Sequence, residues 1–421
     1  MKRIISLILI ISSFSPHVVS QRLVKDSPEN QGMSTDRLTR LSSTLGKYTE
    51  EGKLPGVVAL IARGGKIVYH EAFGYSDLEK EIPMKKDNIF RIASQSKAIV
   101  SVGIMMLQEE GQLLITDPLS QYIPEFLEST VAEIKEGTEY EIVQAKREIT
   151  LRDLLTHTAG IGYGYGPASD KWKAAGIQGW YFAHKEEPIL ETVKKMGQLP
   201  NEAHPGEAYV YGYNTDILGA VIEVVSGKSL EEFLIEKILK PLGMNDTHFY
   251  LPPSKSPRLS VVYNQEKGKL KRAPVDGTMT SQGEYVSGAR TSFSAGAGLL
   301  STSMDYAIFL QMLLNGGEYN GSRIISRKSV ELMISNHLGD VKFPWSEGTG
   351  FGLGFAITTD LGERGLLGTK GEFGWGGAYH SVYWADPIED LLVVYFTQVI
   401  PISLDDHEKL RPLVYQSLID E

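Results

Sequence analysis

The most constraining feature of the sequence is a serine followed three residues later by a lysine, at the entrance to a long apolar stretch. Ser94 and Lys97 precede the run from Ala98 to Leu107, in which most residues are apolar. Such a run predicts a helix that is buried on almost all sides and ends at Gly111. Side chains three positions apart on a helix leave the same face one turn apart. The spacing therefore places an amine beside a hydroxyl at the start of a central helix.

This pair has a chemical and a structural interpretation. A serine hydroxyl becomes a nucleophile when a neighbouring base takes its proton, and a helix N-terminus offers N–H groups to a developing oxyanion. In the structural interpretation Ser94 is only a helix cap, and its spacing from Lys97 arose by chance. No other serine of the chain has a lysine three residues on. A lysine beside an apolar helix is also costly without a partner, which favours the chemical interpretation.

The overall composition limits the class of protein. With 421 residues, 42% of them hydrophobic, the chain can bury a large core. It contains no cysteine, so it has neither disulfides nor a thiol nucleophile. The formal charge of −10 disfavours nucleic acid and anionic membranes as partners.

The first twenty residues have the pattern of a secretory signal peptide. Met1-Lys2-Arg3 is followed by the apolar run 4–11 and then by small residues at Val18 and Ser20. We expect a signal peptide over 1–20 with cleavage before Gln21, and a secreted or periplasmic protein. The apolar run is too short to span a bilayer, so no membrane insertion is expected.

Strand patterns lie at both ends of the chain and helical patterns lie between them. Residues 57–74 predict a hairpin that turns at Gly64-Gly65. Further strands are expected over 350–358, 371–375, 380–386 and 391–397. Helices are expected over most of 186–240, over 302–315 as an amphipathic helix and over 404–418, with a solvated excursion over 125–148. The pattern predicts an α+β fold, with an α/β domain from 21–105 and 285–421, a mainly helical inserted domain from 106–284, and an active site between them.

Two other stretches bear on chemistry. Tyrosines alternate from Tyr209 to Tyr213, which is typical of a strand with one aromatic face. Beside a lysine, one of these phenols could instead carry a proton. The glycine-rich stretch 373–380 is either an edge strand with a bulge or a strand whose backbone a carbonyl oxygen must approach closely. His157 and His380 have no clustered partners in the sequence, so each is a candidate structural histidine as much as a functional one.

Several common active-site motifs are absent from the sequence. No His-Glu-x-x-His or clustered His/Asp spacing indicates a metal, and no phosphate-binding loop occurs. No Gly-x-Ser-x-Gly motif is present. We therefore expect neither a metal nor a cofactor.

Taken together, these stretches resemble the serine β-lactamase and penicillin-binding protein superfamily, from about residue 28 to 420. The stretch 90–97 is similar to the superfamily's first motif, which maps Ser94 to the nucleophile and Lys97 to its partner. The stretch 205–214 resembles the approach to its Tyr-x-Asn motif and maps Tyr211 to the catalytic tyrosine. The resemblance is closest to the class C-like branch that holds the family VIII carboxylesterases. It implies a β-lactamase/transpeptidase-like fold, with a central antiparallel sheet flanked by helices and an inserted all-helical domain.

Two departures from the superfamily pattern bear on the substrate. Tyr213 stands where the asparagine belongs, with Asn214 one residue later. The Lys-Thr-Gly strand maps onto Trp375-Gly376-Gly377, so a cation and a hydroxyl are both missing. A tryptophan there offers an apolar wall instead of a charged contact to a substrate carboxylate.

The resemblance implies a serine hydrolase that cleaves carboxylic esters through an acyl-enzyme, and the signal-peptide pattern adds the expectation that it is secreted or periplasmic. Ser94 attacks, Lys97 and Tyr211 move the proton, and the N–H groups of Ser94 and Ala378 hold the oxyanion. The residues expected to line the pocket and bind a small ester or amide are Tyr163, Tyr165, Tyr213, Asn214, Trp375, Gly376, Gly377, Tyr379 and His380. The alternatives are a β-lactamase or D-Ala-D-Ala peptidase on the same residues, and a catalytically silent ligand-binding protein on this fold.

Overall fold

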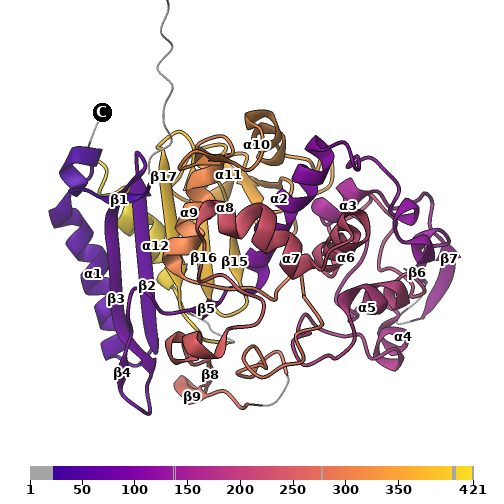
Figure 1. The fold of residues 1–421 in the computed structure, drawn as a ribbon, viewed down its shortest axis with the longest axis horizontal. Coiled ribbons are helices and arrows are strands. Elements are labelled where there is room, and N and C mark those ends of the chain that lie inside the picture. The colour runs from indigo at the N-terminus through magenta and orange to yellow at the C-terminus, as the bar shows by residue number, and fades with distance from the viewer. Residues whose placement is uncertain (1–21, 136, 138, 276–277, 401–403, 420–421) are drawn as a thin grey trace, which may run out of the picture.

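A computed structural model of the chain describes residues 22–135, 137, 139–275, 278–400 and 404–419. The predicted signal peptide lies outside these residues. At the centre is a nine-stranded sheet, in the order β1-β3-β2-β17-β16-β15-β14-β13 with β4 paired to β3 (Figure 1). Its β1–β3 pair is parallel and its other pairs are antiparallel. The strands are β1 (Val24–Lys25), β2 (Gly56–Arg63), β3 (Lys66–Asp77), β4 (Ile82–Pro83), β13 (Thr349–Phe351), β14 (Ala356–Thr358), β15 (Phe373–Gly377), β16 (Ser381–Asp386) and β17 (Leu391–Phe396).

The two ends of the chain meet inside this sheet. Strand β2 pairs with β17 from Val58↔Phe396 to Arg63↔Leu391. Both strands are almost continuously apolar and almost wholly buried, because both faces of the sheet are covered at this point. The predicted hairpin is confirmed: β2 turns into β3 at Gly64 and Gly65, both of which have positive φ.

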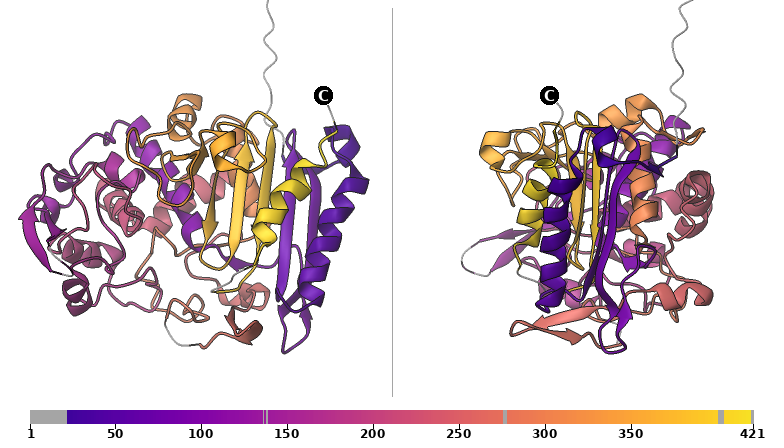
Figure 2. Two further views of the ribbon diagram at one scale, coloured as in Figure 1. Left: turned by 180° about the vertical axis from the view of Figure 1, so that it is seen from behind. Right: turned by 90° about the vertical axis from the view of Figure 1, so that its left-hand side faces the viewer.

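Helices cover the sheet on both faces, as the edge-on view shows (Figure 2). Helix α1 (Thr35–Glu50) and helix α12 (Asp406–Tyr415) pack on one face, in one apolar cluster with β2 and β17. Helix α2 (Ser96–Glu109) and helix α9 (Ser303–Leu314) belong to the cluster on the other face. The sequence predicted an amphipathic α9, which is wrong. Even its polar residues Ser303, Asp305 and Gln311 are buried, because α9 lies between the sheet and the helical part of the chain.

The middle of the chain forms the helical part beside the sheet (Figure 1). The stretch 125–148, predicted as a solvated excursion, instead contains a hairpin of β6 (Thr130–Ile134) and β7 (Tyr140–Gln144), although most of β7 is indeed exposed. The helices here are α3 (Leu151–Leu155), α4 (Ser169–Ala174), α5 (Ile189–Met196), α6 (Asn214–Ser226), α7 (Leu230–Leu234) and α8 (Lys240–Leu242).

Short elements complete the fold. They are β5 (Phe90–Arg91), paired with β10 (Leu300–Ser301), the hairpin β8 (Tyr263–Glu266) and β9 (Lys269–Arg272), the hairpin β11 (Glu318–Tyr319) and β12 (Ser322–Arg323), and the helices α10 (Arg327–Met333) and α11 (Leu361–Arg364). The predicted α+β class is confirmed, with one parallel pair in the sheet. Across the described ranges, no helix has the length and apolar character needed to cross a membrane.

Candidate active site

Ser94 lies in a tight turn in front of the buried helix. The turn spans Ala93–Gln95 and helix α2 begins at Ser96, so Ser94 precedes the helix by two residues. Ala93 has a φ of 44°, a left-handed conformation that is uncommon for a residue with a side chain. Backbone strain of this kind concentrates at functional sites, where the surrounding structure holds it in place.

Lys97 lies beneath Ser94 and is fully buried. Its Nζ donates to Ser94 Oγ at 3.5 Å, to Tyr163 Oη at 3.3 Å and to the Gly296 carbonyl oxygen at 2.7 Å. These three bonds use the three donors of an ammonium group. The burial cost of the lysine is thus offset by three oxygens, one of which belongs to the candidate nucleophile.

Two tyrosines face Lys97 in different ways. Its Nζ lies 4.6 Å from the centroid of the Tyr211 ring, and Tyr211 Oη accepts a hydrogen bond from Trp375 Nε1 at 3.1 Å. Tyr163 binds Lys97 directly, but burial raises its pKa well above the usual value, so this phenol keeps its proton. Tyr211 therefore remains the candidate proton carrier. If it loses its proton, the Trp375 N–H and the charge of Lys97 both stabilise the phenolate.

A buried carboxyl group supports the lysine from below. Asp216, in helix α6, accepts from Ser294 Oγ at 2.7 Å and from the Gly296 N–H at 3.1 Å. Burial raises the pKa of Asp216, and the nearby charge of Lys97 opposes that rise. A Cβ on Gly296 would lie 2.5 Å from Asp216 Oδ2 and 3.4 Å from Lys97 Nζ, so this position must be glycine.

The end of strand β15 lies against the turn that holds Ser94. A Cβ on Gly377 would meet the Ile92 carbonyl oxygen at 2.6 Å, so the two backbones touch without an intervening side chain. This contact brings the backbone of Ala378, the predicted oxyanion donor, beside the segment that carries Ser94. The glycine at this position permits that backbone contact, while the approach of a substrate carbonyl oxygen to this stretch stays a prediction.

A cavity of about 600 Å³ opens over Ser94. Of the residues predicted for the site, it is lined by Ser94, Tyr163, Tyr211, Trp375, Gly376, Gly377, Ala378 and His380. Lys97 does not line it but reaches Ser94 from below. Five further residues line the cavity and were not predicted: Trp180, Trp345, Ser381, Ile400 and His407. Only Ser381 could have been anticipated, since it follows His380 in sequence; the others approach from distant segments that carry no motif.

Four of the predicted lining residues lie elsewhere. Tyr379 is fully buried in a separate apolar cluster, because it lies in the turn after β15, which His380 N–H closes onto the Gly377 carbonyl oxygen. Tyr213 is also fully buried and donates to the Gly179 carbonyl oxygen at 2.6 Å. Asn214 donates to the Ile161 and Val210 carbonyl oxygens and to His157, so it fixes the backbone at the start of α6. Tyr165 lies on the surface with 60% of its area exposed.

His157 has a structural role in this arrangement. Its ring lies 4.6 Å from that of Tyr211, and burial lowers its pKa well below the usual value, with the charge of Lys97 adding to the effect. The imidazole is therefore neutral, and it accepts a hydrogen bond from Asn214 at 2.9 Å. It packs behind Tyr211 and does not line the cavity.

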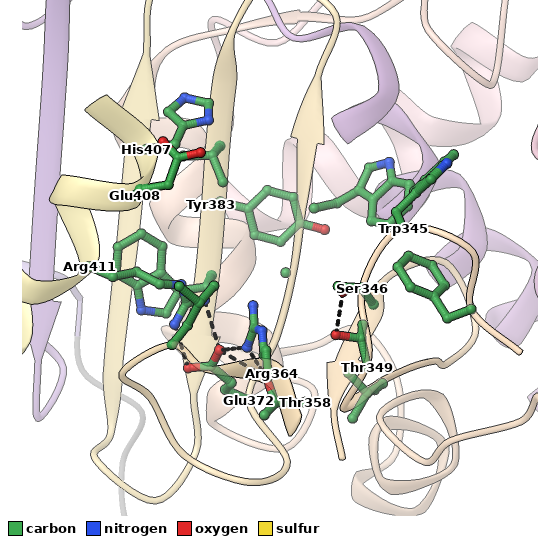
Figure 3. A pocket seen from close by; sticks show the side chains of 18 residues that line it. Trp345, Ser346, Thr349, Thr358, Arg364, Glu372, Tyr383, His407, Glu408 and Arg411 are labelled. Atoms are coloured by element: carbon green, nitrogen blue, oxygen red, sulfur yellow. Dashed lines mark hydrogen bonds and ion pairs between the residues drawn. The ribbon is translucent and has the colours of Figure 1, made fainter. Parts of the chain in front are cut away.

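A second cavity of about 320 Å³ adjoins the first across Trp345, Trp375 and His407, which line both. Figure 3 shows Trp345 on one side of it and the buried ion pairs of Glu372 with Arg364 and Arg411 at the other. Both arginines pair with the same carboxylate, so this network is a structural element of the cavity wall.

One group of side chains in the described part of the chain brings possible metal ligands together: His380, Asp406 and His407, whose ligand atoms lie within 4.8 Å of one another. The two imidazole rings are stacked, 3.9 Å apart and only 7° from parallel. The in-plane lone pairs of parallel rings do not converge on one ion about 2.0–2.1 Å from both nitrogens. This geometry does not fit a metal that both histidines would bind.

The arrangement is chemically that of a serine nucleophile with a proton-transfer pair. Ser94 opens to the cavity, while Lys97 and Tyr211 can take its proton. Ser94 and Ala378, whose backbone N–H groups were predicted to hold the oxyanion, both line this cavity.

Comparison with known proteins assigns the family. The model of the "Beta-lactamase" family matches residues 41–409. The chain belongs to the β-lactamase family. The β-lactamase/transpeptidase-like fold and the family resemblance predicted from the sequence are thereby confirmed, and the chain is a member of a family of hydrolases.

Relatives with esterase and penicillin-binding names lie in the same family. The esterase EstB of Burkholderia gladioli is 28% identical over 376 residues, which cover 85% of this chain and 89% of EstB. The structure of EstCE1, a hydrolase with promiscuous acyltransferase activity, is 26% identical with a TM-score of 0.79, covering 90% of this chain and 99% of EstCE1. The octameric penicillin-binding protein homologue of Pyrococcus abyssi is 27% identical with a TM-score of 0.64, covering 86% of this chain and 73% of that one.

Proposed function

We propose that this β-lactamase-family protein is a carboxylesterase that cleaves neutral esters through an acyl-enzyme on Ser94. The observation that carries the proposal is the chemistry of the cavity over Ser94. None of its thirteen lining residues, all within the described chain, is a lysine, arginine, aspartate or glutamate, and five of them are tyrosine or tryptophan (Tyr163, Trp180, Tyr211, Trp345 and Trp375). Such walls bind an apolar ester and offer no charged partner to a carboxylate. The similarity to EstB and EstCE1 supports the same activity.

The proposed mechanism uses the contacts already described. Ser94 Oγ attacks the ester carbonyl while its proton passes to the pair of Lys97 and Tyr211, which then protonates the leaving alcohol. The N–H groups of Ser94 and Ala378 stabilise the oxyanion. Water then releases the acid from Ser94.

The rival function is that of a β-lactamase or D-Ala-D-Ala peptidase, which the likeness to the Pyrococcus protein favours. The test compares kcat/KM for p-nitrophenyl butyrate, nitrocefin and an N-acyl-D-Ala-D-Ala peptide. We expect efficient cleavage of the ester and little or none of the other two. Nitrocefin turnover as efficient as ester turnover would replace the proposal with the rival.

Covalent labelling separates an enzyme from a silent ligand-binding protein. A fluorophosphonate should label the wild type once, and Ser94→Ala should abolish both labelling and ester turnover. Ser381→Ala is the matched control, because Ser381 lines the same cavity and its loss should leave labelling intact. Full labelling of the Ser94→Ala variant would refute the assignment of the nucleophile.

We further propose that the protein is exported. The support is the charged start, short apolar run and small residues of the first twenty positions. Expression with and without residues 1–20, followed by intact-mass measurement of the extracellular and periplasmic fractions, should find a chain that begins at Gln21.

A further inference from the structure

His380 lies in the wall of the cavity over Ser94 in a fixed and strained conformation. Its φ is 61°, in the left-handed region, and its N–H donates to the Gly377 carbonyl oxygen at 3.0 Å. It follows Ala378 by two residues, so their Cα atoms are at most about 7.6 Å apart. His380 is thus close to the oxyanion donor and lines the same cavity as the nucleophile.

A buried carboxylate orients the His380 ring. Nε2 of His380 lies 2.7 Å from Asp406 Oδ1, and Tyr395 Oη donates to Asp406 Oδ2 at 2.5 Å. Burial on its own would raise the pKa of Asp406, but the hydrogen bond from His380, the nearby histidine charges and the bond from Tyr395 hold it below its usual value. Asp406 is therefore a carboxylate that fixes the tautomer of His380, and Nδ1 is the ring nitrogen left as an acceptor.

His407 supports the ring of His380 from one face. The two imidazoles stack 3.9 Å apart at an angle of 7°. Burial lowers the pKa of His407 to about 4, and the charge of His380 adds to the effect. His407 is thus neutral and packs against the ring of His380. The position of His380 is therefore fixed by two residues of α12, Asp406 and His407, and through Asp406 by Tyr395 of β17.

The reaction proposed for Ser94 leaves a task for such a group. Lys97 is fully buried and absent from the cavity lining, and all three of its donors are used. Hydrolysis of the acyl-enzyme needs a base that can reach an incoming water, and two residues that line the cavity offer one, Tyr211 and His380. A histidine oriented by a buried carboxylate is the arrangement that proteins use for this purpose.

We propose that His380, oriented by Asp406, is the general base of the second half of the reaction, in which water attacks the acyl group on Ser94. This role rests on the proposed esterase function. The water oxygen bonds to the acyl carbon while one of its protons passes to Nδ1 of His380. The bond between the acyl carbon and Ser94 Oγ then breaks, and Oγ takes the proton that His380 holds.

The proton balance of this step closes without a further reactant. The pair of Lys97 and Tyr211 is unchanged in this step, because it gave its proton to the alcohol in the first half of the reaction. The second proton of the water leaves the product acid for the solvent, and His380 is neutral again. The products are a carboxylate, one released proton and the free serine.

The test separates the two halves of the reaction. In His380→Asn the new residue tolerates the left-handed backbone, so the fold should survive. With p-nitrophenyl acetate we expect a burst of one equivalent of p-nitrophenolate, as fast as in the wild type, followed by turnover that is at least about a hundredfold slower. Intact mass should show the acetyl group held on the protein at Ser94. His184→Asn, on an exposed histidine outside the cavity, is the matched control and should not accumulate acyl-enzyme.

A second variant removes the ring and allows it to be replaced. His380→Gly keeps the backbone conformation accessible, and added imidazole should restore turnover in proportion to its concentration. A purely structural role predicts that burst and turnover fall together and that imidazole restores neither, which would overturn the proposal, as would unchanged turnover in His380→Asn. If the wild type shows no burst labelling at Ser94 and no ester turnover, it is the esterase function itself that fails.

Discussion

Lys97 owes its position to residues far from it in sequence. Its shortest hydrogen bond, 2.7 Å, runs to the carbonyl oxygen of Gly296, about two hundred residues away, and the same glycine donates its N–H to Asp216. The lysine is thus aimed by a backbone segment and not by its own helix alone. Because Gly296 has no side chain, it can touch the lysine and the carboxyl group together.

A methyl group at position 296 should misplace the lysine. In Gly296→Ala the new Cβ would lie 2.5 Å from Asp216 Oδ2, so the carboxyl group and Lys97 must move apart. We expect kcat for p-nitrophenyl butyrate to fall about a hundredfold, the scale of lost proton-transfer catalysis. Gly46→Ala is the matched control, since its Cβ would meet Phe73 at an ordinary 3.8 Å. Equal activities in the two variants would show that Lys97 does not need this segment.

His70 allows a prediction of pH dependence at a single residue. Burial lowers the pKa of His70 to about 4 from a usual 6.5, with help from Lys86 and Lys25, and its Nε2 lies 3.1 Å from Ser303 Oγ. Between pH 4 and pH 6.5, His70 is protonated in the unfolded chain but stays neutral in the folded protein. The contribution of His70 to stability is therefore lost as pH falls below about 6.5.

His70→Gln should remove this pH dependence, because glutamine does not titrate. Relative to the wild type, the free energy of unfolding of the variant should improve by about 2 kcal/mol between pH 7 and pH 5. Urea unfolding of both proteins at the two pH values measures the difference. A constant difference would mean that His70 is protonated equally in the folded and unfolded states.

At the scale of elements, strand β15 is the part that joins the two halves of the site. It carries Trp375, whose N–H meets Tyr211, and it ends at Gly377, which touches the backbone of Ile92. Ala378 follows directly. A shift at the end of this strand therefore moves the proposed oxyanion donor relative to Ser94.

Gly377→Ala tests this coupling. Its Cβ would lie 2.5 Å from Ser381 Oγ and 2.6 Å from the Ile92 oxygen, so the strand end must separate from the turn that carries Ser94. We expect kcat to fall by about 10²–10³, the usual effect of losing one oxyanion donor, with KM nearly unchanged. The neighbouring Gly376→Ala, with its closest contact at 3.3 Å, should lower kcat far less. A change confined to KM in Gly377→Ala would contradict the oxyanion role of this strand.

At the scale of the whole molecule, the last helix, α12, is held in place by contacts with Glu372. Arg411 of α12 donates to Glu372 Oε2 at 3.0 Å, Arg364 of α11 pairs with the same carboxylate, and Tyr415 donates to it at 2.9 Å. Glu372 is 1% exposed. These contacts fasten α11 and α12 to the loop before β15 and so to the strand that shapes the site (Figure 3).

Glu372→Gln should destabilise the whole protein because it leaves the buried Arg411 and the partly buried Arg364 without their counter-charge. The expected loss in the free energy of unfolding is about 3–5 kcal/mol. Glu71→Gln breaks an exposed pair with Lys86 and should cost no more than about 1 kcal/mol. Thermal and urea unfolding of the three proteins compare the two losses. Similar small losses would show that water screens the Glu372 pairs.

Features that depend on nearby residues could be predicted from the sequence. The hairpin around Gly64, the buried helix after Ser94 and the strands near the C-terminus follow from hydrophobic period and turn residues, because these act over a few positions. The contact between Ser94 and Lys97 is local for the same reason. Helix α9 was misjudged as amphipathic because its sequence does not show that its polar residues are buried by segments far away in the chain.

The sequence by itself determined the α+β class, the local pairing of serine with lysine and the family resemblance. Only the tertiary structure decided which side chains meet in the cavity. In the fold Tyr163 is hydrogen-bonded to Lys97, Tyr213 and Asn214 are buried in the core, and Asp406 is hydrogen-bonded to His380. The physical reason is that these contacts join segments tens to hundreds of residues apart, where no periodicity connects the partners and only the packing of sheet and helices sets the distance.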